Sequence, residues 1–267
     1  METAYSPTPR TTPTRYRERA RYDRRTVHDI LDEALICHLG YLSAGRPVVL
    51  PTTHARRDET LYLHGSTGGG PLQAAKAGTA SGAGLPVCVT VTLVDGLVLA
   101  RSAMHHSMNF RSVVVVGDAR VVDDPTEKSR ALDCLLDHIA PGRAADCRAP
   151  DARELAATGV LALDLVEVSA KVRSGPPVDD PQDLGLPHWA GVVPVSLAAG
   201  TPVPAGDLDP ATRVPPYLET AGPELRGAHA SGCRTRARRV LSHQVPTSMT
   251  VPAQAMPSIQ PESTSLT

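Results

Sequence analysis

The feature that most constrains the fold is a pair of valine-rich segments near the middle of the chain. In "PVCVTVTLVDGLVLA" (residues 86–100) apolar residues occupy every second position up to Leu93, which is the period of a β-strand with one buried face. Asp95-Gly96 is typical of a two-residue hairpin turn. Four consecutive valines follow at 113–116, and valine on both faces indicates a strand that is covered on both sides. These segments predict a hairpin at the centre of an antiparallel sheet.

Further strands and helices are expected on both sides of this hairpin. Alternating or apolar runs predict strands at 35–42, 46–54, 60–65 and 160–175. Helices are predicted at 26–35 with Thr26 as the cap, at 124–140, where Asp124-Pro125-Thr126-Glu127 is typical of a helix start, and near 151–158. The expected fold class is mainly β with helices, a β-barrel of six or seven strands.

The charges of the chain give little support for a polyanionic partner. The 27 Lys and Arg residues are balanced by 28 Asp and Glu residues, for a net charge of −1. A local run, "RYRERARYDRR" (residues 15–25), could be a nucleic-acid arm, but Glu18 and Asp23 interrupt it. A solvated or partner-docking segment is the preferred interpretation, and no nucleic-acid binding is expected.

Cysteine usage and the chain ends indicate a cytoplasmic protein. The five cysteines are odd in number and show no C-x-x-C spacing, which argues against a disulfide framework and a zinc ribbon. Neither a signal peptide nor an apolar run of about 20 residues is present, so no membrane association is expected. Residues 1–14 and 217–267 are rich in Pro, Ser or Thr and predict a disordered lead-in and tail around one domain, 15–216.

The histidines do not predict a metal site. His105 and His106 are adjacent, so in an extended segment their side chains point in opposite directions. His54 and His64 lie near predicted strand ends, but no carboxylate or cysteine accompanies them at ligand spacing. No G-x-S-x-G elbow or other nucleophile arrangement is present, and the pattern identifies no catalytic residue.

Two polar clusters could bind an anion. "HGSTGGG" (64–70) offers backbone N–H groups and the Ser66 hydroxyl, with Lys76 in the helix that follows, although a plain surface loop would have the same composition. Asn109, Arg111 and Ser112 place an amide, a cation and a hydroxyl at the start of the valine strand. A half-buried Arg111 needs either an anionic ligand or a carboxylate such as Asp118 or Asp123. Both alternatives stay open on the residues alone.

Three segments together resemble one known family. They are "TVHDILDEALICHLGYLSAGRPVVLPTTHARRDETLYLHGST", "PVCVTVTLVDGLVLARSAMHHSMNFRSVVVVGDARVVDD" and "SAKVRSGPPVDD" with "LPHWAGVVPV". In this order they resemble the pyridoxamine 5'-phosphate oxidase-related family, and more closely its flavin-nucleotide-binding branch, which includes nitroimidazole reductases. The likeness runs from about Thr14 to Pro216. It implies a six-stranded antiparallel split β-barrel that forms a homodimer, with FMN at the subunit interface.

The resemblance also implies a cofactor site. The residues implied along the flavin ring and ribityl chain are Pro51, Thr52 and Thr53, and those implied at the phosphate are His64, Gly65 and Ser66. Asn109, Arg111 and Ser112 would close the site at the start of a strand, and Trp189 would lie beside the ring. Relatives usually carry a basic residue two or three places after H-G-S, where this chain has glycines and Pro71. Lys76 is the candidate replacement.

The function expected from this resemblance is an FMN-binding oxidoreductase that moves electrons from NAD(P)H to a small acceptor. The chemistry would belong to the flavin, which explains why no acid–base pair stands out. The alternative is a non-catalytic flavin, deazaflavin or haem carrier or sensor, suggested by His64, His105 and His106 beside a phosphate loop that has lost its cation. True pyridoxamine 5'-phosphate oxidation is a third option, with Lys171 and Arg173 as the nearest residues to hold a substrate phosphate.

Overall fold

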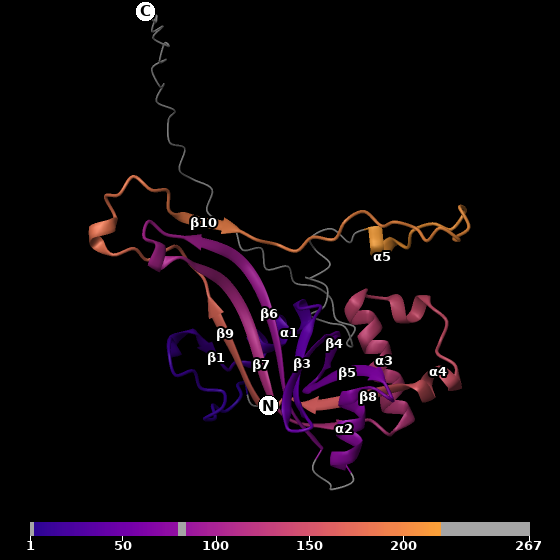
Figure 1. Ribbon diagram of the computed structural model, residues 1–267. Helices are drawn as coiled ribbons and strands as arrows, with labels where there is room; N and C mark the ends of the chain where they lie inside the picture. The colour runs from indigo at the N-terminus through magenta and orange to yellow at the C-terminus, as the bar shows by residue number, and fades with distance from the viewer. Residues whose placement is uncertain (1–2, 80–83, 220–267) are drawn as a thin grey trace, which may run out of the picture. The chain divides into compact units, whose positions relative to one another are not determined.

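A long antiparallel hairpin is the central element of the fold in the computed structural model, which describes residues 3–79 and 84–219 (Figure 1). Strands β6 (Leu85–Leu99) and β7 (Ser107–Val121) pair along their length, and β7 buries Val113 and Val115 completely. The predicted tail 217–267 lies outside the described residues, apart from the short helix α5 (Pro216–Glu219).

The remaining strands extend this hairpin into a mostly antiparallel sheet, which confirms the expected split-barrel fold class. The order along the main path is β3-β2-β6-β7-β8-β5-β4. The added strands are β2 (Cys37–Ser43), β3 (Arg46–Thr52), β4 (His54–Arg57), β5 (Thr60–Ser66) and β8 (Thr158–Asp164). β3 and β4 end the path on opposite sides, yet only Thr53 separates them in sequence. The chain thus connects the two edges of the sheet where no pairing joins them among the described strands.

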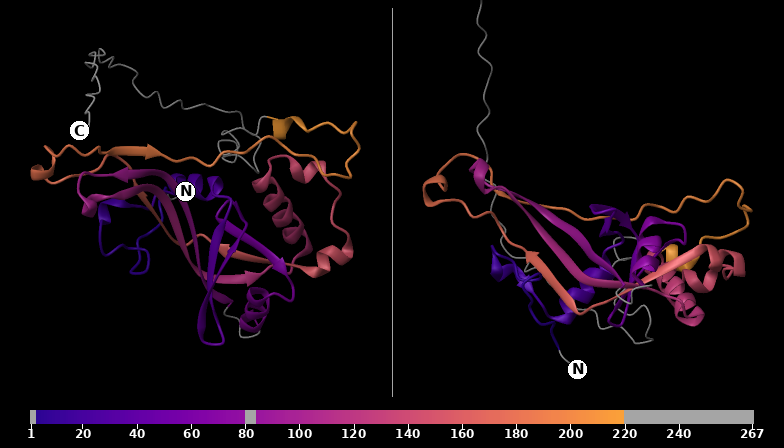
Figure 2. Two further views of the ribbon diagram at one scale, coloured as in Figure 1. Left: turned by 45° about the horizontal axis from the view of Figure 1, so that its top comes forward. Right: turned by 60° about the horizontal axis from the view of Figure 1, so that its bottom comes forward.

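Three short strands attach outside the main path. β9 (Glu167–Arg173) pairs with β7 and with β1 (Ala20–Arg21), while β10 (Gly191–Pro194) pairs with the outer part of β6. The segment 160–175, predicted as one strand, is divided into β8 and β9 at Leu165 and Val166. In the views of Figures 1 and 2, β10 runs across the far end of the hairpin, away from α2, α3 and α4.

The turn predicted at Asp95-Gly96 is wrong, because β6 continues through both residues with a bulge between Val94 and Gly96. The carboxylate of Asp95 is held by Arg111, and β10 passes so close that a Cβ at Gly96 would lie 2.9 Å from Val192 Cγ1. The hairpin turns instead at residues 100–106, which include a short 3-10 helix at Ala103–His105. The polar segment around His105 and His106 is therefore the tip of the hairpin.

The helices begin close to the predicted positions. α1 (Arg24–Glu33) is capped by Asp23, whose side chain accepts from the Thr26 backbone, so Thr26 is not the cap. α3 (Pro125–Ile139) begins at Asp124 as predicted. α2 (Gly70–Thr79) follows the glycine loop, and α4 (Ala152–Ala157) precedes β8.

A continuous aliphatic core joins α1 and α2 to the sheet. It contains Val27, Ile30 and Leu31 of α1 and the inward residues of β2, β5, β6, β7 and β8. A smaller cluster lies under α3 around Ala131 and Val160. No helix among the described residues has both the length and the apolar character needed to cross a bilayer.

Residues 3–14 are packed against the fold, where the sequence predicted a disordered lead-in over residues 1–14; residues 1 and 2 lie outside the described ranges. Tyr5 is 4% exposed, its backbone N–H donates to Tyr22 O and its hydroxyl donates to Glu59. Thr8 and Arg10 bond to Glu167 of β9. Long-range polar contacts and one buried aromatic ring therefore order residues whose Pro and Thr content suggested none.

Candidate functional site

The first candidate site, the His64 pocket, is a cavity of about 230 Å³ between β3, β5 and α2. It lies where the two ends of the sheet approach each other, and the structure brings five of the predicted site residues to it: Pro51, Thr52, His64, Gly65 and Ser66. Five leucines supply most of its wall (Leu39, Leu50, Leu63, Leu72, Leu161). No charged side chain lines it.

A pair of glycines determines the floor of this pocket. Gly65 of β5 lies directly opposite Gly159 of β8, and Leu72 of α2 packs over both. A Cβ at Gly159 would lie 2.6 Å from Leu72 Cδ1, so only glycine lets the helix approach this closely. Leu72 is 3% exposed as a result.

The glycine loop does not present the donors that a phosphate needs. The backbone N–H of Gly69 donates to Ser66 O at 2.8 Å, that of Gly68 to Ser66 Oγ at 3.3 Å and that of Thr67 to Ala157 O at 3.0 Å. Lys76 is exposed on α2 and does not line the cavity. A dianion would therefore meet neither free N–H groups at these positions nor a cation in the wall.

His64 is the titratable side chain that this pocket offers. Its side chain is exposed at the end of β5, and no residue of the described chain forms a hydrogen bond or ion pair with its imidazole. An imidazole without a partner beside leucine walls is suited to ligate a metal carried by a flat apolar group.

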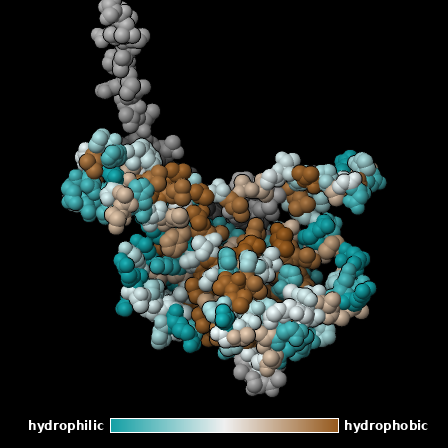
Figure 3. Space-filling model, viewed as in Figure 1, coloured by the Kyte–Doolittle hydropathy of each residue, from teal (hydrophilic) through white to brown (hydrophobic). Residues whose placement is uncertain are grey.

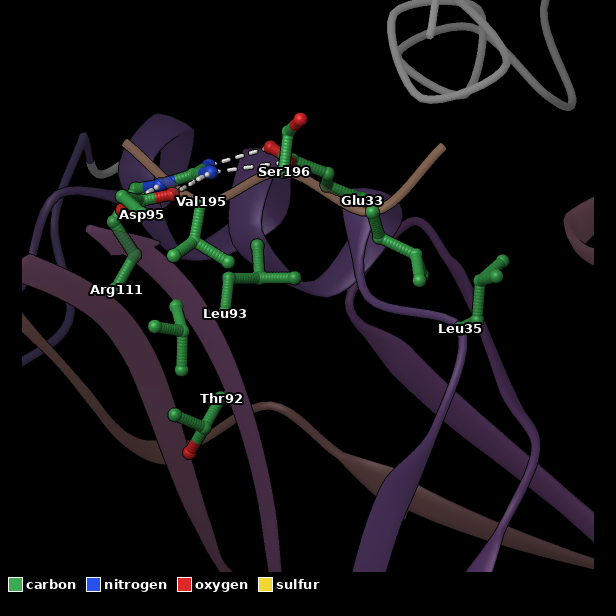
Figure 4. Close-up of a pocket in the computed structure, with 10 residues that line it drawn as sticks. Glu33, Leu35, Thr92, Leu93, Asp95, Arg111, Val195 and Ser196 are labelled. Atoms are coloured by element: carbon green, nitrogen blue, oxygen red, sulfur yellow. Dashed lines mark hydrogen bonds and ion pairs between the residues drawn. The ribbon is translucent and has the colours of Figure 1, made fainter. Parts of the chain in front are cut away.

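The second candidate site, the Arg111 pocket, is a cavity of about 440 Å³ between the end of α1, β6, β7 and the segment after β10. Apolar side chains line most of it, including Leu35, Leu93 and Leu197, and the Ser196 hydroxyl adds a polar group. Figure 4 shows the Arg111 guanidinium between the carboxylates of Glu33 and Asp95. The two pockets share no lining residue.

Arg111 is already neutralised by its own chain. Its Nε and Nη2 donate to Asp95 at 3.0 and 2.8 Å, and Nη1 and Nη2 donate to Glu33, the latter at 2.9 Å. These bonds raise the pKa of Arg111 well above its usual value. The carboxylate alternative left open by the sequence is therefore observed, with Glu33 and Asp95 in place of Asp118 or Asp123. Two carboxylates on one cation leave a net negative charge, which disfavours phosphate.

The other predicted site residues lie outside both pockets. Asn109 is bonded to Arg173 and to Gly175 O, and Ser112 Oγ donates to Lys171 O at 3.4 Å. Trp189 is 66% exposed, with its indole over Gly191. Thr53 connects β3 to β4 and lines neither cavity.

The other histidines singled out in the sequence do not line the His64 pocket. His105 Nε2 lies 3.3 Å from Asp180, and His106 Nδ1 lies 3.1 Å from Ser102 O at the hairpin tip. His54 is buried between α1 and α3, with Nε2 at 2.9 Å from Leu31 O and its ring 4.9 Å from that of His138. Burial lowers the pKa of His54 to about 4. No group of three or more His, Cys, Asp or Glu residues arranged for a metal occurs in the described ranges.

Sequence reasoning missed the partners that shape each pocket. Glu33 is 78 residues from Arg111, and no local pattern connects them. Leu72 could have been recognised as an inward residue of a short helix, but its position over Gly159 depends on strand pairing. The available signal was the glycine at the start of β8, which weakens a strand unless something approaches it closely.

The sheet with its open seam and the cavity at that seam define a split β-barrel. A family model described as pyridoxamine 5'-phosphate oxidase matches residues 23–172. The chain therefore belongs to the pyridoxamine 5'-phosphate oxidase family.

Two solved structures are similar over most of the chain. The flavocytochrome Anf3 from Azotobacter vinelandii is 38% identical, with a TM-score of 0.74 over 80% of this chain and 97% of that one. The FAD- and haem-binding protein from Mycobacterium smegmatis is 35% identical, with a TM-score of 0.71 over 76% of this chain and 97% of that one. No curated protein matches the sequence significantly.

Proposed function

We propose that this protein is a redox protein that binds a haem and a flavin in two separate cavities. The observation that carries the proposal is the pair of pockets that share no residue and differ in charge. The names of the two similar structures support it, since one is a flavocytochrome and the other binds FAD and haem. The haem- and flavin-binding alternative is thus favoured over a flavin enzyme alone.

The haem is assigned to the His64 pocket. Haem iron is commonly held by a histidine, and the faces of the macrocycle are apolar, so His64 would supply the axial ligand while leucines of β2, β3 and α2 contact the ring. The absence of charged residues from the wall suits the apolar faces of the macrocycle better than a flavin phosphate, with the haem propionates directed to solvent.

The flavin is assigned to the Arg111 pocket. Its volume lies within the range of about 300–1,000 Å³ typical of small-molecule sites, and its walls are mostly apolar. The guanidinium and the two carboxylates would meet the polar edge of an isoalloxazine ring, and the phosphates would extend away from them. We favour FAD over the FMN expected from the sequence because FAD is the flavin named for a relative; a deazaflavin would be distinguished by its absorbance.

The described residues at both pockets are suited to position a cofactor. A bound flavin would supply hydride and electron chemistry, and the residues around it would set its position and electrostatics. NAD(P)H as electron source and a small molecule as acceptor stay part of the proposal. Steady NADPH consumption by the flavin-loaded protein would support an enzymatic role.

A homodimer would complete the His64 pocket. At about 230 Å³ this cavity is smaller than a typical ligand site, so one chain would cover only part of a haem. Apolar side chains gather over β3 and β6 in Figure 3, and Leu42, Val49 and Leu50 are exposed on β2 and β3 beside the pocket. A second copy packed against this face would bury them and enclose the cofactor.

Spectroscopic titration tests the proposed function. Haem added to the purified protein should give a Soret band that saturates near one haem per chain, and FAD should bind without displacing it. Light scattering should report a dimer, which Val49→Asp should weaken while Val203→Asp, at an exposed position in the segment after β10, should not. Purified protein that binds neither haem nor flavin would contradict the proposal.

A further inference from the structure

The amino-terminal segment forms a basic surface that neither cavity uses. It consists of Arg15 and Arg19, which lie over the exposed ring of Tyr16, and of Lys171 and Arg173 on the adjoining strand β9. Strand β1 places Ala20 directly opposite Lys171 of β9, and the 3-10 helix before β1 contacts the same strand. Figure 1 shows this indigo segment beside β9.

Two cations of this surface share one face of β9, and the other two flank Tyr16. Lys171 and Arg173 alternate along β9 with the buried residues Val168 and Ala170, so their side chains lie on the face away from the core. The guanidinium carbons of Arg15 and Arg19 lie 5.4 and 4.0 Å from the centroid of the Tyr16 ring. Burial, and secondarily the charge of Arg19, lower the pKa of Arg173, as expected for neighbouring cations.

These cations lack the carboxylate partners found elsewhere in the fold. Over the described ranges, Arg15, Lys171 and Arg173 form no ion pair, and Arg19 reaches only Glu18 at 3.8 Å. By contrast, Arg101 and Arg120 each bond a carboxylate at 2.8 Å or less. Tyr16 itself has a φ of 54°, a left-handed conformation that costs free energy for a residue with a side chain. An unbalanced basic cluster on a strained turn is a site for an anionic partner.

We infer that this basic surface docks an acidic protein that exchanges electrons with the bound cofactors; the redox role of that partner rests on the proposed function. Charge complementarity accelerates encounter between redox proteins and sets their orientation. None of the described cavities includes a member of the basic surface, which suits a protein better than a small anion.

A nucleic acid fits the surface less well than a protein. The whole chain has a net charge of −1 and a pI of about 6.8, so the basic surface is offset by acids elsewhere that would repel an extended polyanion. Nucleic-acid-binding domains commonly have a pI above about 9. A compact acidic protein can contact the basic surface alone.

The test uses a reduced acidic [2Fe–2S] ferredoxin as the probe. Its binding to the full chain is measured by calorimetry at about 50 and 500 mM salt, and the rate of haem reduction is followed by stopped flow in haem-loaded protein. The variant Arg15→Gln/Arg19→Gln/Lys171→Gln should bind the probe about tenfold more weakly at low salt and lose most of the salt dependence. A matched control, Arg130→Gln/Arg153→Gln/Arg213→Gln, removes three exposed arginines elsewhere and should behave as wild type.

Three other results would overturn the inference. Unchanged probe binding by the triple variant would remove the basic surface from docking, and tighter binding of a 20-base-pair DNA duplex than of the ferredoxin would replace the protein partner by nucleic acid. Loss of flavin from the variant would assign the surface to the cofactor. Reduction by dithionite is the control for redox competence, and failure to load haem would contradict the proposed function while calorimetry still tests docking.

Discussion

The His64 pocket contains no charged side chain, whereas the Arg111 pocket is built around three. In the first, an unpartnered imidazole stands at the edge of leucine walls. In the second, each of the three guanidinium nitrogens donates to a carboxylate of the same chain. The difference shows that a polar residue near a cavity is informative when its partners are known. Arg111 is engaged by carboxylates of its own chain, whereas the exposed His64 has no partner among the described residues and is available to a ligand.

The largest expected effect separates the two pockets by their ligands. His64→Ala should weaken haem binding at least about 100-fold, because it removes the proposed iron ligand, and should leave flavin affinity unchanged. The control is His38→Ala, which removes an exposed histidine from β2, a strand that does not pair with β5. Haem titration followed by the Soret band measures the effect, and retention of normal haem affinity by His64→Ala would break the comparison.

Acidification should destabilise the fold around α1, against which His54 is buried. The pKa of buried His54 is about 4, below the value near 6.5 of the unfolded chain, so the unfolded chain takes up the proton first as the pH falls. The contribution of His54 to the free energy of unfolding should be constant above about pH 6.5. Between about pH 6.5 and pH 4, protonation should lower the free energy of unfolding by up to about 3 kcal/mol. Urea unfolding across this range measures it.

His54→Gln should remove this component of the acid sensitivity. Because His54 bonds the carbonyl of Leu31 in α1, which also carries Glu33, acid should loosen the Arg111 pocket before the His64 pocket. An identical pH dependence in wild type and His54→Gln would show that another group is responsible.

Removing the cation of the Arg111 pocket should lower both the free energy of unfolding and the affinity for flavin. Arg111→Met leaves Glu33 and Asp95 facing each other, and the expected loss is about 1–3 kcal/mol because all three side chains are partly exposed. Arg120→Met, whose single partner Glu127 lies near the surface, is the control and should cost less. Denaturant unfolding and FAD titration measure the two effects, and haem binding should not change.

The smallest effect concerns the floor of the His64 pocket. Gly159→Ala places a Cβ against Leu72, so α2 must shift and the expected cost is about 1 kcal/mol together with weaker haem binding. Gly200→Ala, where nothing lies within 4 Å, is the matched control. If both variants were equally stable, the close approach of α2 would not shape the pocket.

The sequence predicted the parts of the fold that depend on local pattern. The valine alternation identified β6 and β7, and Asp124 with Pro125 identified the start of α3. The prediction of a turn at Asp95-Gly96 was wrong because the Arg111 side chain and strand β10 hold these two residues within a bulged part of β6. Local preference does not contain such contacts.

The candidate site was predictable in part. The resemblance named Pro51, Thr52, His64, Gly65 and Ser66, which one cavity brings together, and Arg111, which lines another; their role in binding a cofactor stays a prediction. Pairing of Arg111 with Glu33 depends on how α1 packs on the sheet. The number of separate cavities is a property of the tertiary structure.

The most direct test of the account is the binding of haem and FAD to the same sample of full-length protein. Absorbance titration of FAD into haem-saturated protein, followed by mass spectrometry of the intact complex under native conditions, counts both cofactors per chain. Two independent cavities predict one haem and one flavin bound at the same time, with neither affinity altered by more than a few-fold. Release of one haem for each FAD bound would show that the two cofactors compete for one site and would contradict the account.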